Sequence, residues 1–297
     1  MYYLIYGCLY LLSLLPFFIL YLISDVVYVL LYYVFGYRKK IVQNNLAIAF
    51  PEKTLKEQTR IAKQFYKNLV DTFIEMIKMV SMSKHEFEKR CTIDLEPINA
   101  LVLKGKNIQL QSGHQMNWEY ANWIMGNNSP IPFIGIYKTI GNAAVNKLFF
   151  KIRAKYNTIL VSTTDFRTKK DEILKGQYAI ALAADQNGNP DQCFWLNFFG
   201  KPVPFVTGPA KGAIKNNNAV IFINFVKIER GYYHFATQVM VENANEYSPE
   251  HLTLQYRDLL EKTIRETPDN YLWTHRRWRH EYKNSYSHLW IDTTNPN

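Results

Sequence analysis

The chain carries almost no charge over its first 36 residues, where Asp25 is the only charged side chain. Leu, Ile, Tyr, Phe and Val dominate this stretch, and about 20 apolar residues suffice to span the hydrocarbon core of a bilayer. The stretch also lacks the basic start and the small-residue cleavage site of a secretory signal peptide. We therefore expect residues 1–36 to be retained as a membrane anchor.

One proline, Pro16, interrupts this anchor, so the sequence does not fix whether the anchor is one helix or two. Pro16 should kink or divide a helix, so one spanning helix and a re-entrant pair both remain compatible with the sequence. A buried pair of helices in a soluble protein is the alternative to any membrane role. Three cations follow at positions 38–40. Under the positive-inside tendency they predict that residues 37–297, expected to form one catalytic domain, face the cytoplasm.

Cysteine is scarce, which excludes several classes of site. Cys8, Cys91 and Cys193 lie far apart without C-x-x-C spacing, so neither a disulfide framework nor a zinc ribbon is expected. The histidines form no H-E-x-x-H motif, and no Ser or Cys lies in a nucleophile-elbow sequence. We expect a reducing compartment, no metal, no cofactor and no covalent intermediate.

Positive charge is in excess, with a formal net charge of +10. Such a balance indicates an acidic partner, which could be nucleic acid, an anionic membrane surface or an acidic carrier protein. Aromatic residues make up 15% of the chain although its mean hydropathy is only −0.21. The apolar residues must therefore be concentrated, which agrees with a local membrane segment.

Periodicity predicts the fold class. A capping box at Thr54 and Glu57 begins an amphipathic helix that should run to about Val80. Beyond residue 100, short apolar runs alternate with polar helical stretches, the pattern of an α/β fold. The expected strands are residues 107–111, 132–137, 158–161, 178–184, 219–226 and 232–242. The expected helices are residues 117–125, 142–155, 168–175, 209–217 and 249–266.

The best candidate for chemistry is His114, at the carboxyl end of an expected strand. Glu119 follows five residues later. If Asn117 caps the next helix, His114 precedes that helix and can meet Glu119. A carboxylate bonded to one imidazole nitrogen makes the other a better general base, so we expect Glu119 to orient His114. A structural histidine is the simpler alternative.

Further motifs accompany this pair along the chain. They are Tyr37-Arg38-Lys39-Lys40, Asn45-Leu46, Phe50-Pro51-Glu52-Lys53, Ser112-Gly113-His114, Asn117-Trp118-Glu119, Ala184-Asp185-Gln186, Phe198-Phe199-Gly200, Thr207-Gly208 and residues 271–278. Together they make the chain resemble the bacterial late acyltransferases of lipid A biosynthesis, the lauroyl and myristoyl transferase family. That family is related to the glycerophosphate acyltransferases by a His-x4-Asp/Glu motif.

The resemblance implies a fold and a reaction. The fold would be a glycerophosphate-acyltransferase-like mixed sheet flanked by helices, behind the N-terminal anchor. The reaction would be O-acyl transfer from an acyl thioester, on acyl carrier protein or coenzyme A, to a hydroxyl of a lipid A precursor at the bacterial inner membrane. His114 would be the base and Glu119 its orienting group, with no nucleic acid partner.

The resemblance also implies residues that bind substrate. Lys138 stands where the family often has Arg, and this departure weakens the inference about the acceptor. Arg153 would contact an anionic group, with a surface arginine as the alternative, and Asp185 and Gln186 would shape the site. Thr207 and Gly208 would begin a helix whose first N–H groups could bind an oxyanion or phosphate.

Two other segments are open to a functional or a packing interpretation. Residues 198–205 could form apolar loops that line an acyl channel, although buried aromatic loops more often serve packing alone. The cluster at residues 275–280 alternates basic and aromatic side chains and would add positive surface for headgroups or a carrier. Two alternatives to the lipid A reaction remain: the same chemistry on another membrane lipid, and a lipid-binding protein without activity.

Overall fold

The computed structural model describes residues 2–294 and 296, and its N-terminus is divided at Pro16. Helix α1 (Tyr2–Ser13) ends before this proline and α2 (Phe17–Val29) begins after it, continuing into the π-helical turn η1 (Leu30–Val34). The predicted break is therefore confirmed. The segment Phe17–Val34, with a mean hydropathy of 2.1, is long and apolar enough to cross a membrane.

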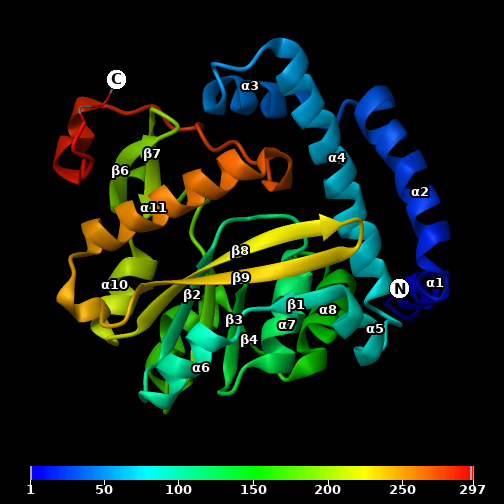
Figure 1. Ribbon diagram of the computed structural model, residues 1–297, viewed down its shortest axis with the longest axis horizontal. Coiled ribbons are helices and arrows are strands. Elements are labelled where there is room, and N and C mark those ends of the chain that lie inside the picture. Colours follow the sequence, from blue (N-terminus) through cyan, green and yellow to red (C-terminus); the bar gives the residue numbers. More distant parts are fainter. Residues whose placement is uncertain (1, 295, 297) are drawn as a thin grey trace.

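Helix α2 lies along α4 (Leu55–Lys78) and is tied to it by polar contacts (Figure 1). Ser24 donates a hydrogen bond of 2.7 Å to Asp71, and the Tyr21 hydroxyl donates one of 2.9 Å to Glu75. On the outward side, apolar side chains such as Val26 remain exposed. One side of α2 therefore packs against α4, and the opposite side is exposed.

The helices around α4 complete this part of the chain. The predicted capping box of α4 is present, with Thr54 and Glu57 bonded reciprocally, and the helix ends two residues before the predicted Val80. Short helices α3 (Lys39–Ala49), α5 (Lys84–Arg90) and α6 (Glu96–Leu103) lie on either side of it in sequence. Asn45 of α3 donates to the carbonyls of Trp273 and His275, so α3 fixes the C-terminal segment.

A seven-stranded mixed sheet forms the centre, in the order β1-β9-β8-β2-β5-β3-β4. Only the β8–β9 pair is antiparallel; the other neighbours are parallel. The α/β class with a mixed sheet is therefore confirmed. The strands are β1 (Cys91–Ile93), β2 (Ile108–Ser112), β3 (Phe133–Tyr137), β4 (Ile159–Ser162), β5 (Ala179–Ala183), β8 (Ala219–Glu229) and β9 (Tyr232–Val241).

Helices cover both faces of the sheet and bury its apolar side chains. On one face, Phe222 joins a core with α4, α10 and α11, and on the other Leu110 joins one with α5 to α8. These helices are α7 (Trp118–Asn128), α8 (Ala143–Arg153), α9 (Thr163–Ile173), α10 (Gly208–Lys215) and α11 (Pro249–Glu266). Helix α9 begins earlier than predicted because Ser162 caps it through the Asp165 N–H.

Residues 198–205, interpreted from sequence as apolar loops, belong instead to a β-hairpin. Strands β6 (Cys193–Phe198) and β7 (Lys201–Val206) pair antiparallel. Phe199 and Gly200 both have positive φ, as a tight two-residue hairpin turn requires. Pro202 and Pro204 are two residues apart, so their missing N–H groups fall on the same side of β7, and the ladder to β6 tolerates both.

The C-terminal basic cluster is only partly on the surface, so it adds less positive surface than the sequence predicted. Arg277 is 1% exposed, and its Nη1 donates to Asn187 and to the carbonyl of Pro204. Its guanidinium also lies 4.3 Å from the ring centroid of Phe205. Arg276 and Arg279 remain exposed. Arg277 therefore joins the hairpin to the C-terminal segment.

Candidate functional site

The site begins where β2 ends. Gly113 and His114 follow Ser112 directly, and the His114 carbonyl accepts a hydrogen bond of 3.0 Å from the Leu272 N–H. A Cβ at position 113 would lie 2.4 Å from Leu260 Cδ1, so glycine permits this close approach of α11. The backbone of the turn is therefore fixed from two sides.

Asp185 holds the His114 ring in place. Its Oδ1 lies 2.6 Å from His114 Nδ1, and its Oδ2 accepts the His114 backbone N–H at 3.0 Å. A carboxylate at Nδ1 fixes the proton there, so Nε2 carries the free lone pair. Asp185 is 1% exposed, whereas the His114 side chain is 28% exposed. The arrangement is that of a general base with an accessible nitrogen.

The two groups shift each other's proton affinity. Burial by itself lowers the pKa of His114, but the charge of Asp185 and its hydrogen bond outweigh burial, so the pKa is raised from 6.5. Burial raises the pKa of Asp185, yet the His114 charge and hydrogen bonds lower it to about 2. Asp185 is therefore ionised at neutral pH and stabilises a protonated His114.

Glu119 does not orient His114 as predicted. Its carboxylate accepts from Arg153 Nε at 3.0 and 2.9 Å and also from Arg153 Nη2. Among the described residues no hydrogen bond joins Glu119 to His114. The physical reason is the course of the chain: Glu119 lies in the first turn of α7, which points it at the end of α8, while β5 brings Asp185 beside His114.

One cavity of about 350 Å³ unites most of these groups. His114, Glu119, Arg153 and Lys138 all line it. The remaining wall is largely apolar. It includes Leu110, Ala121, Met125, Phe133, Ile136, Leu160, Ala181, Ile223 and Phe225. The cavity thus combines one base, one ion pair and one lysine with an apolar interior, as an amphipathic ligand requires.

Other predicted site residues lie outside this cavity. Gln186 follows Asp185 but is not among the residues described as lining it. Thr207 is the N-cap of α10, although its side chain makes no capping hydrogen bond, and Gly208 is the first residue of that helix. The proposed roles of Gln186, Thr207 and Gly208 in binding remain predictions.

A second buried carboxylate, Glu75, was not predicted from the sequence. Glu75 is 0% exposed, and it accepts from the Tyr233 hydroxyl at 2.8 Å, the Tyr21 hydroxyl at 2.9 Å and the side chain of Asn117. Asn117 has a φ of 64° and is the N-cap of α7. Glu75 therefore joins α2 and β9 to the turn between His114 and Glu119. A Glu within the run Phe73-Ile74-Glu75-Met76-Ile77 was the available signal.

Replacing Glu75 by Gln should remove a pH dependence of stability. Burial, followed by the charge of Asp71, raises the pKa of Glu75 from 4.5 to about 7. A raised pKa in the folded state means that the stability it contributes is full below pH 4.5 and is lost as the pH rises through about 7. Thermal unfolding in detergent should show this loss in wild type and not in Glu75→Gln.

The control is Glu75→Ala, which leaves the Tyr21, Tyr233 and Asn117 donors without their acceptor. It should cost about 3 kcal/mol or more at every pH, because unpaired buried donors carry the full penalty of desolvation. Gln retains an acceptor oxygen and the side-chain volume. Equal losses in the Gln and Ala variants would show that the network does not depend on these hydrogen bonds.

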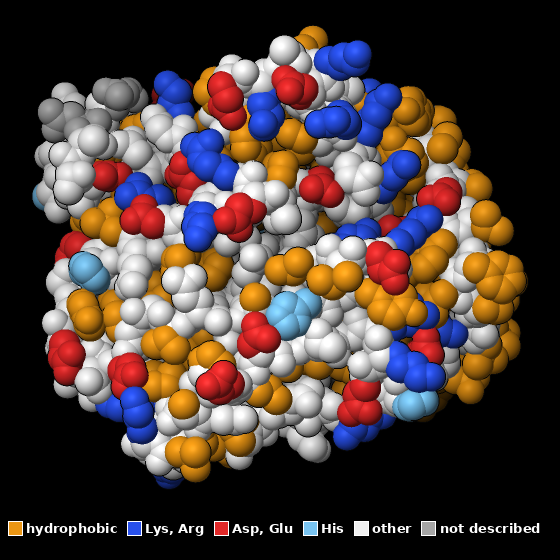
Figure 2. Space-filling model, in the orientation of Figure 1, with side chains coloured by type: hydrophobic (Ala, Val, Ile, Leu, Met, Phe, Trp, Pro, Cys, Tyr) orange, Lys and Arg blue, Asp and Glu red, His pale blue; other side chains and the backbone are white. Residues whose placement is uncertain are grey.

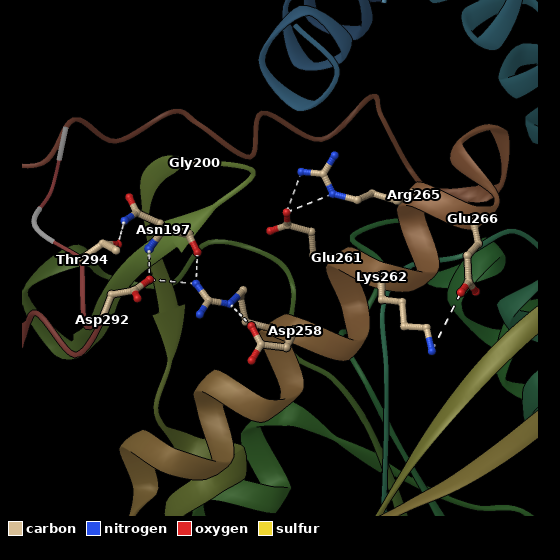
Figure 3. A pocket seen from close by; sticks show the side chains of 10 residues that line it. Asn197, Gly200, Asp258, Glu261, Lys262, Arg265, Glu266, Asp292 and Thr294 are labelled. Carbon is tan, nitrogen blue, oxygen red and sulfur yellow. Dashed lines mark hydrogen bonds and ion pairs between the residues drawn. The ribbon is translucent and has the colours of Figure 1, made fainter. Parts of the chain in front are cut away.

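A different cavity, of about 650 Å³, opens between α11 and the β6–β7 hairpin (Figure 3). Its charges are paired with one another. Arg257 contacts Asp292 at 2.8 Å and Arg265 contacts Glu261 at 2.7 Å. Its described lining includes no histidine or cysteine. This cavity offers neither a base nor an unpaired charge, so the site around His114 remains the candidate.

Comparison with known proteins identifies the family of the chain. The family described as "Bacterial lipid A biosynthesis acyltransferase" matches residues 1–280. The lipid A biosynthesis palmitoleoyltransferase of Escherichia coli (strain K12) is 20% identical over 245 residues, which cover 82% of this chain and 79% of that protein. The lipid A biosynthesis acyltransferase of Shigella flexneri matches with the same identity and coverage. The chain therefore belongs to the bacterial lipid A biosynthesis acyltransferase family.

Proposed function

We propose that this protein transfers a fatty acyl group from an acyl thioester to a hydroxyl of a lipid A precursor, with His114 as the general base. Acyl carrier protein is the preferred donor and coenzyme A the alternative. The reaction would occur at the bacterial inner membrane, with the site facing the cytoplasm where acyl thioesters are made. No cofactor is required.

The observation that carries this proposal is the position of His114 at a cavity whose wall is largely apolar. Its Nε2 is free to accept a proton because Nδ1 is bonded to Asp185. The apolar wall suits an acyl chain, while Arg153 and Lys138 provide positive charge in the same cavity. Family membership supports the acyl transfer independently of this geometry.

The steps follow from that geometry. Nε2 of His114 takes the proton of the acceptor hydroxyl as its oxygen attacks the thioester carbonyl. The resulting imidazolium is stabilised by Asp185. The tetrahedral intermediate collapses, the C–S bond breaks, and the departing thiolate takes the proton from His114. The products are an ester and a free thiol, and His114 is neutral again.

The Glu119–Arg153 pair would hold a cation beside the reacting centre. Arg153 uses Nε and Nη2 for Glu119, while its Nη1 has no hydrogen-bond partner among the described residues. A guanidinium fixed in this way can bind a phosphate oxygen or the developing oxyanion. Lys138 would add a second positive charge for a phosphate group of the donor or acceptor.

The pH dependence of the reaction should report His114. The reactive form is the neutral ring, and the pKa of His114 is raised above 6.5 by Asp185. Activity should therefore rise with pH and reach half of its maximum above pH 6.5. The measurement is kcat/KM for a soluble acyl thioester, obtained from initial rates at pH values on both sides of 6.5. A midpoint below 6.5 would contradict the assignment of the base.

The test of the function itself is mass spectrometry of lipid A from a strain that lacks this protein. We expect loss of one acyl chain, restored by the wild-type gene and not by His114→Ala. An unchanged lipid A profile, together with loss of an acyl chain from another lipid, would retain the chemistry and replace the acceptor. Unchanged profiles of all membrane lipids would favour the lipid-binding protein without activity.

A further inference from the structure

A groove runs between the N-terminal helical segment and α4, on the part of the molecule that Figure 2 shows at the upper right, where basic and apolar side chains adjoin. Its volume is about 1550 Å³. One wall carries Tyr28, Val29 and Tyr33 from α2 and η1, and the other is the exposed side of the first half of α4. Its described lining shares no residue with the cavity at His114.

Four cations from α4 line this groove. Lys56, Arg60, Lys63 and Lys67 follow one another at intervals of four, three and four residues, so they lie on the same side of the helix. Among the described residues, none of the four forms an ion pair. Lys63 and Lys67 instead approach the rings of Tyr33 and Tyr28, with Nζ 5.6 and 5.5 Å from the ring centroids.

Two carboxylates also line the groove, against the four cations. Glu57 is the partner of Thr54 in the capping box, where it accepts hydrogen bonds of 2.8 and 2.7 Å. Asp269 accepts from the Asn68 side chain at 2.9 Å. The donors to both carboxylates are neutral groups, and the groove keeps an excess of positive charge because four cations line it against two carboxylates.

The apolar surface next to the groove indicates the kind of ligand. Exposed apolar side chains recur every four residues along the outward side of α2 and η1, at Phe18, Leu22, Val26, Leu30 and Val34. This segment is the candidate membrane span. A row of cations beside an apolar helix matches the two parts of an anionic lipid, a phosphate headgroup next to acyl chains.

We propose that the groove between α2–η1 and α4 binds the phosphate headgroup of an anionic bilayer phospholipid, whose acyl chains lie along α2. Arg60 and Lys63 bind the phosphate, and the tyrosine hydroxyls and rings contact the glycerol and headgroup. This lipid is a structural ligand and not the acyl acceptor, since the groove is separate from the proposed acyl-transfer cavity.

The test uses the full-length protein in nonionic detergent micelles, with phosphatidylglycerol as the probe and native mass spectrometry to count bound lipid. The variant is Arg60→Gln combined with Lys63→Gln. The matched control is Arg167→Gln combined with Lys170→Gln, which removes the same charge from α9. We expect the groove variant to bind phosphatidylglycerol about 30-fold more weakly, because each cation near a lipid surface contributes about 1 kcal/mol, and the control to bind it as wild type does.

Four results would overturn the proposal. Equal losses of binding in the two double variants would mean that only net charge matters. Equal binding of phosphatidylcholine would remove the role of anionic charge, and displacement by inorganic phosphate alone would indicate a bare anion site. Acyl transfer provides a separate readout, because the groove variant should keep the wild-type KM for the acceptor. A raised KM would make the groove part of the acceptor path.

Discussion

His114→Ala should reduce the rate of acyl transfer by about 10²–10⁴-fold, the range that a positioned general base contributes. The KM for the donor should change little, because the ring contributes only a small part of the cavity wall. The expected loss is in kcat, since Nε2 acts on the reacting hydroxyl. Steady-state rates with purified protein in detergent micelles measure both quantities.

The control for His114→Ala is His251→Ala, which changes an exposed histidine of α11. It should retain wild-type kcat and melting temperature. A His114→Ala protein that unfolds like wild type and still transfers acyl groups at a rate within tenfold of it would exclude His114 as the base. The general base would then be a residue that does not lie at the end of β2.

Asp185→Asn should lower the rate of acyl transfer nearly as much, because it changes which nitrogen of His114 carries the proton. The His114 backbone N–H donates to Oδ2, so the amide oxygen of Asn would occupy that position and its NH₂ would face Nδ1. Nδ1 would then have to accept, and the ring proton would move to Nε2. The base would be lost without any change in volume, with an expected fall in kcat of about 10²–10⁴-fold.

Glu119→Gln distinguishes the two carboxylates. It frees Arg153 but leaves the Asp185–His114 pair intact, so the midpoint of the pH profile should stay at its wild-type value. The residual activity of Asp185→Asn should instead have a lower midpoint, because the charge that raises the pKa of His114 is gone. A shift in Glu119→Gln and none in Asp185→Asn would restore Glu119 as the orienting group.

The sequence predicted the central strands well because their apolar runs are local signals. Their order is not local, and this is why the partner of His114 was misassigned. Strands β2 and β5 are parallel neighbours with Ser112 opposite Ala183, so His114 and Asp185 lie equally far beyond the paired ends. The 70 residues between them do not fix the strand order, so the sequence indicated only a site-shaping role for Asp185. Spacing alone favoured Glu119.

The Glu75 network and the β6–β7 hairpin escaped prediction for related reasons. The three donors to Glu75 come from α2, the turn before α7 and β9, which meet only in the folded chain. In the hairpin, the two prolines argue against a strand and the turn lacks the Asn-Gly signal, so the sequence did not predict strands there. The turn forms because Phe199 adopts a positive φ. Both features depend on contacts between segments that are distant in the sequence, and local sequence patterns do not indicate such contacts.

The polar side of α2 limits how a soluble form of this enzyme can be engineered. Deleting residues 1–34 would remove Tyr21 and Ser24 and expose Asp71 and Glu75, together with the apolar side chains packed around them. The shortened protein would lose the apolar surface of α2 but would expose the apolar surface of α4 beneath it, together with two carboxylates that have lost hydrogen-bond donors. Replacing the outward residues Leu22, Val26 and Leu30 by polar ones keeps the inner contacts and is the better route to crystals without detergent.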